Sequence, residues 1–298
     1  MQIKCSSHKK EEGFTSLSGL GLRHPHVDEV LATNPSVGWF EVHSENYMLD
    51  YGPRKEKLLA IRQDYPISLH GVCLSLGSAD GLDLNHLKLL KELIQEIDPC
   101  LVSDHLSWGR YHQVYLQDLL PIPYTPESLN VFCQNLNKAQ EFLGRRLLIE
   151  NPSSYLLFPE STLEEPIFLK EIVKKSGCQV LLDINNIYVA CHNHRWNPYH
   201  YIETFSSEDV GEIHLAGHSL SQENSALLID THSTYVCDEV WELYRYALRH
   251  LGAKPTLIEW DADLPDFAEL QKEANKVSLI IEEEIQYDHQ SQPKTASV

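Results

Sequence analysis

The sequence predicts an α/β protein and, within that class, a (β/α)8 TIM barrel. Eight short apolar segments follow one another along the 298 residues, and helical segments separate most of them. Such alternation is typical of βαβ units and of a parallel sheet. A chain of this length is ordinary for one barrel, and eight strands are the number that closes it.

The predicted strands begin near the N-terminus, where the segment SLSGLGL has the weakest pattern. In chain order they cover residues 16–22, 38–45, 66–71, 100–108, 146–151, 179–186, 211–218 and 255–261. Helices are predicted at 84–97, 128–144, 163–177 and 237–252. The last of these ends in a glycine, as helices often do.

We expect one catalytic barrel domain over residues 14–285. Residues 1–13 form a polar N-terminal segment, and residues 286–298 are predicted to be a disordered tail. The N-terminal segment lacks the apolar middle of a signal peptide, and no apolar run has the length of a membrane span. We therefore expect a cytoplasmic protein without a membrane partner.

Composition argues against several kinds of partner and site. The chain has 24 Lys and Arg against 43 Asp and Glu, a formal net charge of −19, whereas binding to nucleic acid needs a positive surface. Its 7 cysteines form no CxxC motif, which argues against a disulfide framework and a thiolate zinc site. The 16 histidines are the unusual feature, and many of them neighbour Asp, Glu or Asn.

Almost every predicted strand ends in His, Asp or Glu. In the segment QVLLDINN, for example, three apolar residues run directly into Asp183. A buried carboxylate without a partner is costly, so Asp183 needs one. The carboxyl ends of all eight strands of a TIM barrel meet on one face, where active sites lie. Polar residues that are far apart in the sequence are therefore expected to meet there.

These residues form a set of candidate metal ligands. The set is His70, His105, Glu150, Asp183, His214, Asp230, His232 and Glu259. His, Asp and Glu are ligands of zinc, iron and manganese, and the set exceeds the needs of one ion. We therefore expect two or three ions bridged by carboxylates. A lone histidine at a strand end is more often structural, and acidic residues there often cap helices, so the prediction depends on their shared position.

The order of these residues resembles that of the xylose isomerase-like TIM barrels, and most closely that of endonuclease IV, a trinuclear zinc phosphodiesterase. One position departs from that pattern. Endonuclease IV carries Asp-x-x-His after the sixth strand, and here the fourth residue of the motif is Asn186. Asn186 therefore joins the predicted metal ligands.

The finer motifs resemble the multinuclear non-haem iron-dependent oxidative enzymes. They are EVHSENY (41–47), SLHG (68–71), SDHLSW (103–108), IENPSSY (149–155), LLDINNIYV (181–189), IHLAGHS (213–219), DTHS (230–233) and IEWD (258–261). The resemblance covers about residues 15–280. It implies two or three iron ions, as Fe2+ and Fe3+, that work with O2, with zinc as the alternative metal. It also implies a Cys-containing precursor peptide, made on the ribosome, as substrate, and a separate partner protein that binds the leader of that peptide.

Roles can be assigned to some of these residues. Glu150 is the predicted bridging carboxylate, because it lies in the middle of the ligand order. Catalytic roles are predicted for Asp261, His43 and His194. Asp261 is expected to donate a proton or, alternatively, to accept a hydrogen bond that orients a ligand histidine. His43 and His194 are expected to contact the substrate or to support the ligands.

Two other functions are weighed against this one. An endonuclease IV-like phosphodiesterase is the first, and both the net charge of −19 and Asn186 argue against it. A non-catalytic metal-binding protein is the second. The nearly complete ligand set argues against that function.

Overall fold

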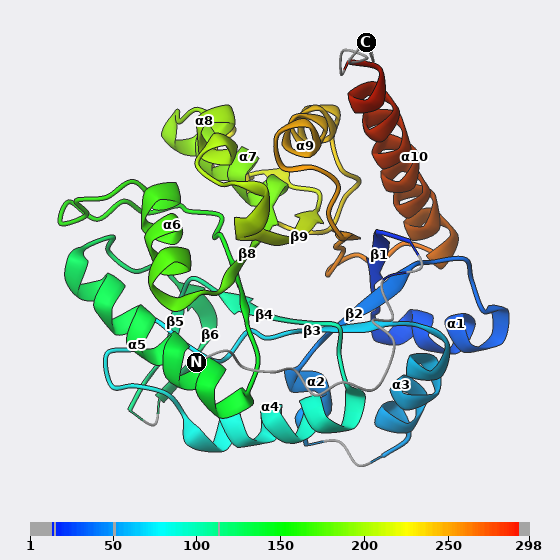
Figure 1. The fold of residues 1–298 in the computed structure, drawn as a ribbon, viewed down its shortest axis with the longest axis horizontal. Coiled ribbons are helices and arrows are strands. Elements are labelled where there is room, and N and C mark those ends of the chain that lie inside the picture. The colour runs from blue at the N-terminus through cyan, green and yellow to red at the C-terminus, as the bar shows by residue number, and fades with distance from the viewer. Residues whose placement is uncertain (1–13, 15, 50–51, 113, 292–298) are drawn as a thin grey trace, which may run out of the picture.

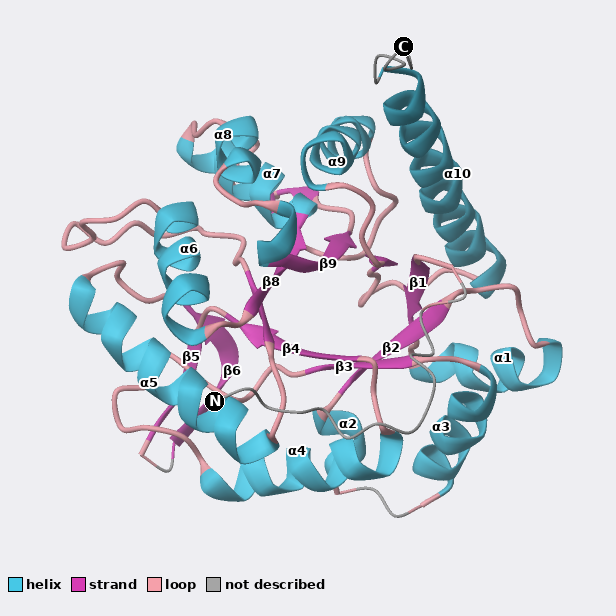
Figure 2. Cartoon of the chain, in the orientation of Figure 1, coloured by secondary structure: helices cyan, strands magenta, loops and turns pink. Residues whose placement is uncertain are grey.

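A closed barrel of eight parallel strands forms the centre of the molecule (Figures 1 and 2). The computed structural model describes residues 14, 16–49, 52–112 and 114–291. The barrel strands are β1 (Ser18–Gly21), β2 (Trp39–His43), β3 (Ile67–His70), β4 (Leu101–His105), β7 (Leu148–Glu150), β8 (Gln179–Asp183), β9 (Val210–Leu215) and β12 (Thr256–Ile258). Each overlaps one predicted strand, and the predicted (β/α)8 fold is confirmed.

Helices surround the barrel and connect its strands (Figure 2). They are η1 (His24–His26), α1 (Val27–Thr33), α2 (Glu45–Met48), α3 (Pro53–Asp64), α4 (Leu84–Ile97), α5 (Pro126–Leu143), α6 (Glu165–Ser176), α7 (Ile184–His194), α8 (Pro198–Glu203), η2 (Ser207–Asp209), α9 (Asp238–Leu251) and α10 (Phe267–Ser291). The four predicted helices correspond to α4, α5, α6 and α9. No helix in the described part of the chain is both long and apolar enough to cross a membrane.

Helix α4 shows why its limits could be predicted. Its buried residues, Leu87, Leu90, Leu93 and Ile97, recur at helical spacing and face the barrel. Asp83 caps the first turn, since its carboxylate accepts from two backbone N–H groups. The predicted and observed bounds of this helix coincide.

Several predicted strands extend too far toward their carboxyl ends. Residues 184–186 do not continue β8 but begin α7, because the Asp183 carboxylate accepts from the Asn186 N–H at 2.7 Å and caps that helix. The predicted strand 100–108 is divided between β4 and β5 (Trp108–Tyr111). Helix α10 continues to Ser291, so the described residues of the predicted tail, 286–291, belong to this helix. The predicted segment 1–13 lies outside the described residues.

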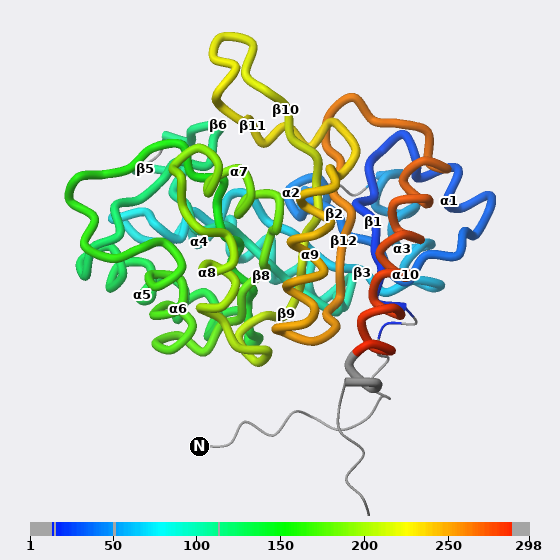
Figure 3. Tube along the Cα trace, turned by 90° about the horizontal axis from the view of Figure 1, so that it is seen from above, coloured from blue at the N-terminus to red at the C-terminus, as the bar shows by residue number. Residues whose placement is uncertain are grey.

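Two short hairpins lie beyond the barrel, and the sequence patterns did not predict them. One pairs β5 with β6 (Val114–Leu120), and the other pairs β10 (Ser219–Leu220) with β11 (Leu228–Ile229). Both lie at the same end of the molecule in the side view of Figure 3. Since β5 follows β4 and β10 follows β9, this is the end at which the barrel strands terminate.

Gly19 explains why the first strand has a weak pattern. It pairs with Trp39 on the neighbouring strand β2. The indole of Trp39 is fully buried, and its Nε1 donates to the Leu17 carbonyl at 3.2 Å. A Cβ atom at Gly19 would lie 2.2 Å from Trp39 Cε2. The strand therefore has no side chain at this position, and the barrel can enclose the indole.

We predict that Gly19→Ala destabilises the barrel by about 1–3 kcal/mol, because the added methyl group overpacks against a buried indole. Urea denaturation of the variant measures this change. Gly211→Ala is the control, since its Cβ would meet the Gln179 and Leu148 side chains at no less than 3.1 Å. Equal losses for the two variants would contradict the explanation.

Candidate metal centre

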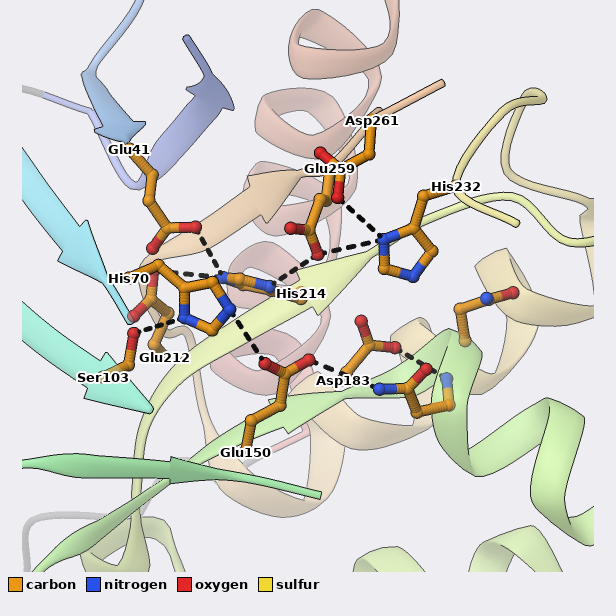
Figure 4. A network of polar contacts seen from close by, with 12 residues as sticks. Glu41, His70, Ser103, Glu150, Asp183, Glu212, His214, His232, Glu259 and Asp261 are labelled. Atoms are coloured by element: carbon orange, nitrogen blue, oxygen red, sulfur yellow. Dashed lines mark hydrogen bonds and ion pairs between the residues drawn. The ribbon is translucent and has the colours of Figure 1, made fainter. Parts of the chain in front are cut away.

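The carboxyl ends of the barrel strands surround a cavity of about 500 Å³. Most of the predicted site residues line it. These are His43, His70, His105, Glu150, Asn186, Asp230, His232, Glu259 and Asp261. The two remaining predicted ligands on barrel strands, Asp183 and His214, are fully buried beside Glu150 and Glu259 (Figure 4). The barrel thus brings together all the predicted metal ligands from different strands and loops.

The first group of ligands is His70, His105 and Glu150. Both imidazole Nε2 atoms face Glu150 Oε2, at 3.2 Å for His70 and 3.0 Å for His105. His105 Nδ1 donates to the Gly71 carbonyl at 3.0 Å, which leaves its Nε2 free to act as a ligand. His70 Nδ1 forms a hydrogen bond of 2.7 Å with Ser103 Oγ (Figure 4). A metal ion or a proton has to lie among these facing acceptors.

Glu150 also belongs to a second group, with Asp183, His214 and Glu259. One ligand atom from each of these four residues lies within 4.8 Å of the others. Asp183 Oδ2 is buried and has no hydrogen-bond partner. Burial and the charge of Glu150 raise the pKa of Asp183 well above its ordinary value. Glu150 thus belongs to both of these candidate groups.

Asp230 and His232 lie beside the second group, and Asn186 lines the same cavity. His232 Nε2 is 2.8 Å from Asp230 Oδ1, and its Nδ1 is 3.3 Å from Glu259 Oε2. Asn186 Nδ2 donates to Glu150 Oε1 at 3.3 Å, whereas its Oδ1 is buried without a partner. The amide oxygen is therefore the atom that Asn186 offers to an ion.

The backbone around His232 holds this residue in position. His232 has a left-handed φ of 45°. Its N–H donates to the Gly217 carbonyl at 3.0 Å, and its own carbonyl accepts from the Asp261 N–H at 2.7 Å. A Cβ atom at Gly217 would lie only 2.1 Å from the Thr234 carbonyl oxygen, so the close approach of these loops requires glycine.

The donor set fits metal ions. Its nitrogen and oxygen atoms suit iron, zinc or manganese, and no cysteine is among the described residues that line the cavity. Asp183 Oδ2 and Asn186 Oδ1 are buried without hydrogen-bond partners. Burial disfavours a charged imidazole, yet Glu41 and Glu150 raise the pKa of His70 to about 10. The centre thus attracts positive charge, which metal ions would supply.

Arg23 and Asp261 form a further contact at the edge of the cavity. Arg23 Nε donates to Asp261 Oδ1 at 2.7 Å, and its Nη2 donates to Glu259 Oε1 at 3.3 Å. Burial opposes ionisation of Asp261, but His232 and Arg23 outweigh it and lower the pKa of Asp261. Asp261 Oδ2 also lies 3.7 Å from His232 Nδ1. Two roles are predicted for Asp261. The geometry favours that of a hydrogen-bond acceptor that orients its neighbours, and not that of a proton donor.

The two other predicted catalytic residues lie in different places. His43 lines the cavity, with Nε2 at 3.9 Å from Glu259 Oε1. His194 is not among the residues that line it. Its Nε2 is 2.8 Å from the Ser154 carbonyl, and its ring lies beside Trp196 near the end of α7. The barrel therefore groups His43 with the ligands and leaves His194 apart.

The sequence patterns did not single out Arg23, Ser103 or Glu212, and they gave Glu41 no role. Glu41 and Glu212 are fully buried, and one oxygen of each lies 3.5 Å from His214 Nε2 (Figure 4). Burial and Glu41 raise the pKa of Glu212 to about 7. A signal existed, because Glu212 interrupts an apolar strand two residues before His214 and so shares its face.

A (β/α)8 barrel whose strand ends gather buried His, Asp and Glu residues has the donor set that a metal-binding TIM barrel needs. The model of the family described as "RiPP precursor modification enzyme MbnB/TglH/ChrH" matches residues 17–282. RiPP denotes a ribosomally synthesised and post-translationally modified peptide. The chain belongs to this family, and the resemblance found in the motifs is confirmed.

Relatives of this chain share its length as well as its sequence. A UPF0276 protein of Rhizobium meliloti (strain 1021) is 45% identical over 269 residues, covering 89% of this chain and 87% of that protein. A UPF0276 protein of Psychromonas ingrahamii is 46% identical over 260 residues, covering 87% of this chain and 92% of that protein.

Solved structures with low sequence identity share the fold. An L-ribulose 3-epimerase superimposes with a TM-score of 0.60 at 14% identity, covering 94% of this chain and 99% of that one. Endonuclease IV from Thermus thermophilus has a TM-score of 0.55 at 17% identity, covering 90% and 98% of the two chains. At these identities the likeness shows the barrel and no shared activity.

We predict that Asp183→Asn lowers the metal bound per chain but leaves the metal-free fold nearly as stable. An asparagine oxygen can still cap α7, and the buried carboxyl has no hydrogen-bond partner at Oδ2 to lose. Elemental analysis measures the metal, and thermal unfolding with and without added Fe2+ measures the stabilisation that bound metal supplies.

Asp104→Asn is the matched control for this prediction. Asp104 is a buried carboxyl at the end of β4 that accepts from the backbone N–H groups of Leu74 and His105 and belongs to none of the candidate metal-binding groups. Its variant should keep the metal. Full metal content in Asp183→Asn, or an equal loss in both variants, would count against the assignment.

Proposed function

We propose that this protein is a multinuclear iron enzyme that uses O2 to oxidise a cysteine residue of a ribosomally made precursor peptide. The observation that carries the proposal is the Glu150 carboxylate, which two adjacent groups of ligands share within a family of RiPP precursor modification enzymes. A bridged pair of ions is an arrangement suited to multi-electron oxidation by O2. The net charge of −19 and Asn186 weigh against the phosphodiesterase alternative.

A different set of residues would hold each ion. His70, His105 and Glu150 would hold one ion, and Glu150, Asp183, His214 and Glu259 a second. Asn186, Asp230 and His232 would hold a third. Bound iron would supply a thiolate-binding position and electron transfer to O2.

The residues around the ligands keep the site rigid. Ser103 and the Gly71 carbonyl fix the rings of His70 and His105, so their Nε2 atoms need no reorientation when an ion binds. Asn151 holds Asp183 from both sides, since its Oδ1 accepts from the Asp183 N–H and its Nδ2 donates to the Asp183 carbonyl. Such support fixes the ligands before substrate enters.

Asp261 and His43 would act on the substrate side of the centre. Both line the cavity, and Arg23 Nε donates to Asp261 Oδ1 at 2.7 Å. Because this hydrogen bond favours the carboxylate form, we assign to Asp261 acceptance of the thiol proton as the cysteine binds. The cavity of about 500 Å³ can admit a cysteine with its flanking backbone. We further propose that a separate protein presents the leader of the precursor peptide.

We predict that iron-loaded protein consumes O2 and changes the mass of a cysteine peptide, whereas the matched serine peptide is unchanged. The thiol is the group that would bind to iron, and a hydroxyl does not replace it. An oxygen electrode and mass spectrometry measure the two effects. Glu150→Ala should abolish both, because it removes a ligand from two groups.

Any of three outcomes would refute the proposal. The serine peptide could be modified equally well, or the reaction could proceed without O2. Zinc-loaded protein could instead nick abasic DNA, which would support the phosphodiesterase. Asp104→Asn again serves as the control that retains activity.

A further inference from the structure

A second cavity, of about 330 Å³, lies beside the metal cavity. It is formed by the segments that follow β6, β7 and α7, and these lie beyond the carboxyl ends of the barrel strands. We call it the apolar pocket and define it by Ile122, Tyr124, Leu156, Leu157, Trp196 and Tyr201. Its size and lining are those of a small ligand site.

Several polar residues also line the apolar pocket, and the charged ones are paired. His200 Nε2 lies 3.6 Å from Glu164 Oε2, and both of these side chains are exposed. Glu165 is buried, and its carboxylate accepts hydrogen bonds of 2.8 Å from the hydroxyls of both Tyr124 and Tyr201. It also accepts from Ser154 Oγ. Because three donors already satisfy this carboxylate, it does not need a charged ligand as a partner. The pocket therefore suits an apolar group.

The apolar pocket adjoins the metal cavity. Leu156 lines both, and Ser154, which lines the metal cavity, is bonded to the Glu165 carboxylate in the wall of the pocket. Leu156 and its neighbour Leu157 are 64% and 57% exposed. Adjacent exposed leucines at the rim of a concave site are typical of a surface that binds a partner.

We propose that the apolar pocket binds one large apolar side chain, such as Phe or Leu, that flanks the modified cysteine of the substrate peptide. This inference rests on the proposed function, because the occupant is the peptide whose cysteine enters the metal cavity. The shared wall at Leu156 is what selects this occupant. A substrate peptide whose cysteine enters the metal cavity would lie beside Leu156. Residues next to that cysteine would then contact the apolar pocket.

The test uses synthetic decapeptides of Ser and Gly with one Cys and one Phe, the Phe placed in turn at each position up to about four residues from the Cys. Binding to iron-loaded protein is measured anaerobically by fluorescence anisotropy, so that no turnover occurs. One or two Phe positions should bind roughly tenfold to a hundredfold more tightly than the peptide without Phe, the gain from burying one such side chain.

Variants of the protein then locate the effect. Leu156→Asp and Leu157→Asp, both at exposed positions, should each reduce the gain from Phe to about twofold or less, since a carboxylate on the wall opposes apolar binding. Leu279→Asp is the matched control, because Leu279 is 59% exposed on α10, away from the pocket, and should leave the gain unchanged.

Peptides with Ser in place of Cys separate this inference from the proposed function. The gain from Phe should persist in them, because it does not involve the thiol. If Phe still tightens binding but no cysteine peptide is oxidised, the binding role of the pocket is supported and the proposed function is refuted. No dependence on Phe position, or a gain that both Asp variants retain, would overturn the pocket. A concentration-dependent dimer that Leu156→Asp dissolves would also overturn it, by assigning the pocket to a second copy of this chain.

Discussion

The shared oxygen of Glu150 is the contact on which the centre depends. Two imidazole nitrogens approach it within 3.2 Å, and the same carboxylate belongs to a second set of buried ligands. Burying several acidic groups together is costly unless positive charge accompanies them. The barrel accepts this cost at one end only, where the strands terminate. The largest apolar cluster joins side chains of the strands with those of the surrounding helices.

A layer of polar residues beneath the ligands gives the centre its shape. Glu41 and Glu212 flank the inner nitrogen of His214, and Ser68 Oγ donates to Glu41 at 3.0 Å. These residues touch no cavity surface, yet they decide which nitrogen of His214 faces the other ligands. Arg23 donates hydrogen bonds to Glu259 and Asp261 and so orients both carboxylates. The chemistry of the site is therefore set by residues that would never meet the substrate.

The barrel is shared with sugar epimerases and with endonuclease IV, and this shows how little the fold says about the reaction. The features of this chain that bear on its reaction are local. Asn186 Oδ1 is buried without a hydrogen-bond partner, and the buried Arg23 donates to Asp261. The apolar pocket adjoins the metal cavity through Leu156. Each of these features is built on the segments after the strands, where a barrel tolerates change without loss of its core.

The order of residues along the chain is enough to predict the barrel and most of the ligand set. Strand and helix periodicity are local properties, and parallel strands in a closed barrel must end on one face, so His70, Glu150 and Asp183 could be placed together without coordinates. Residue 183 also shows the limit. The same carboxylate that ends β8 caps α7, a choice that depends on the hydrogen bond to Asn186.

Which side chains face one another depends on the folded barrel. The ion pair of Arg23 with Asp261 joins residues 238 positions apart. The contacts of Glu41 and Glu212 with His214 depend on how the barrel strands are staggered. His194 lies a whole helix beyond the end of β8, at the last residue of α7, where its Nε2 contacts the Ser154 carbonyl and does not line the metal cavity. Sequence patterns record the face on which a residue lies, whereas contact across a barrel depends on its closure.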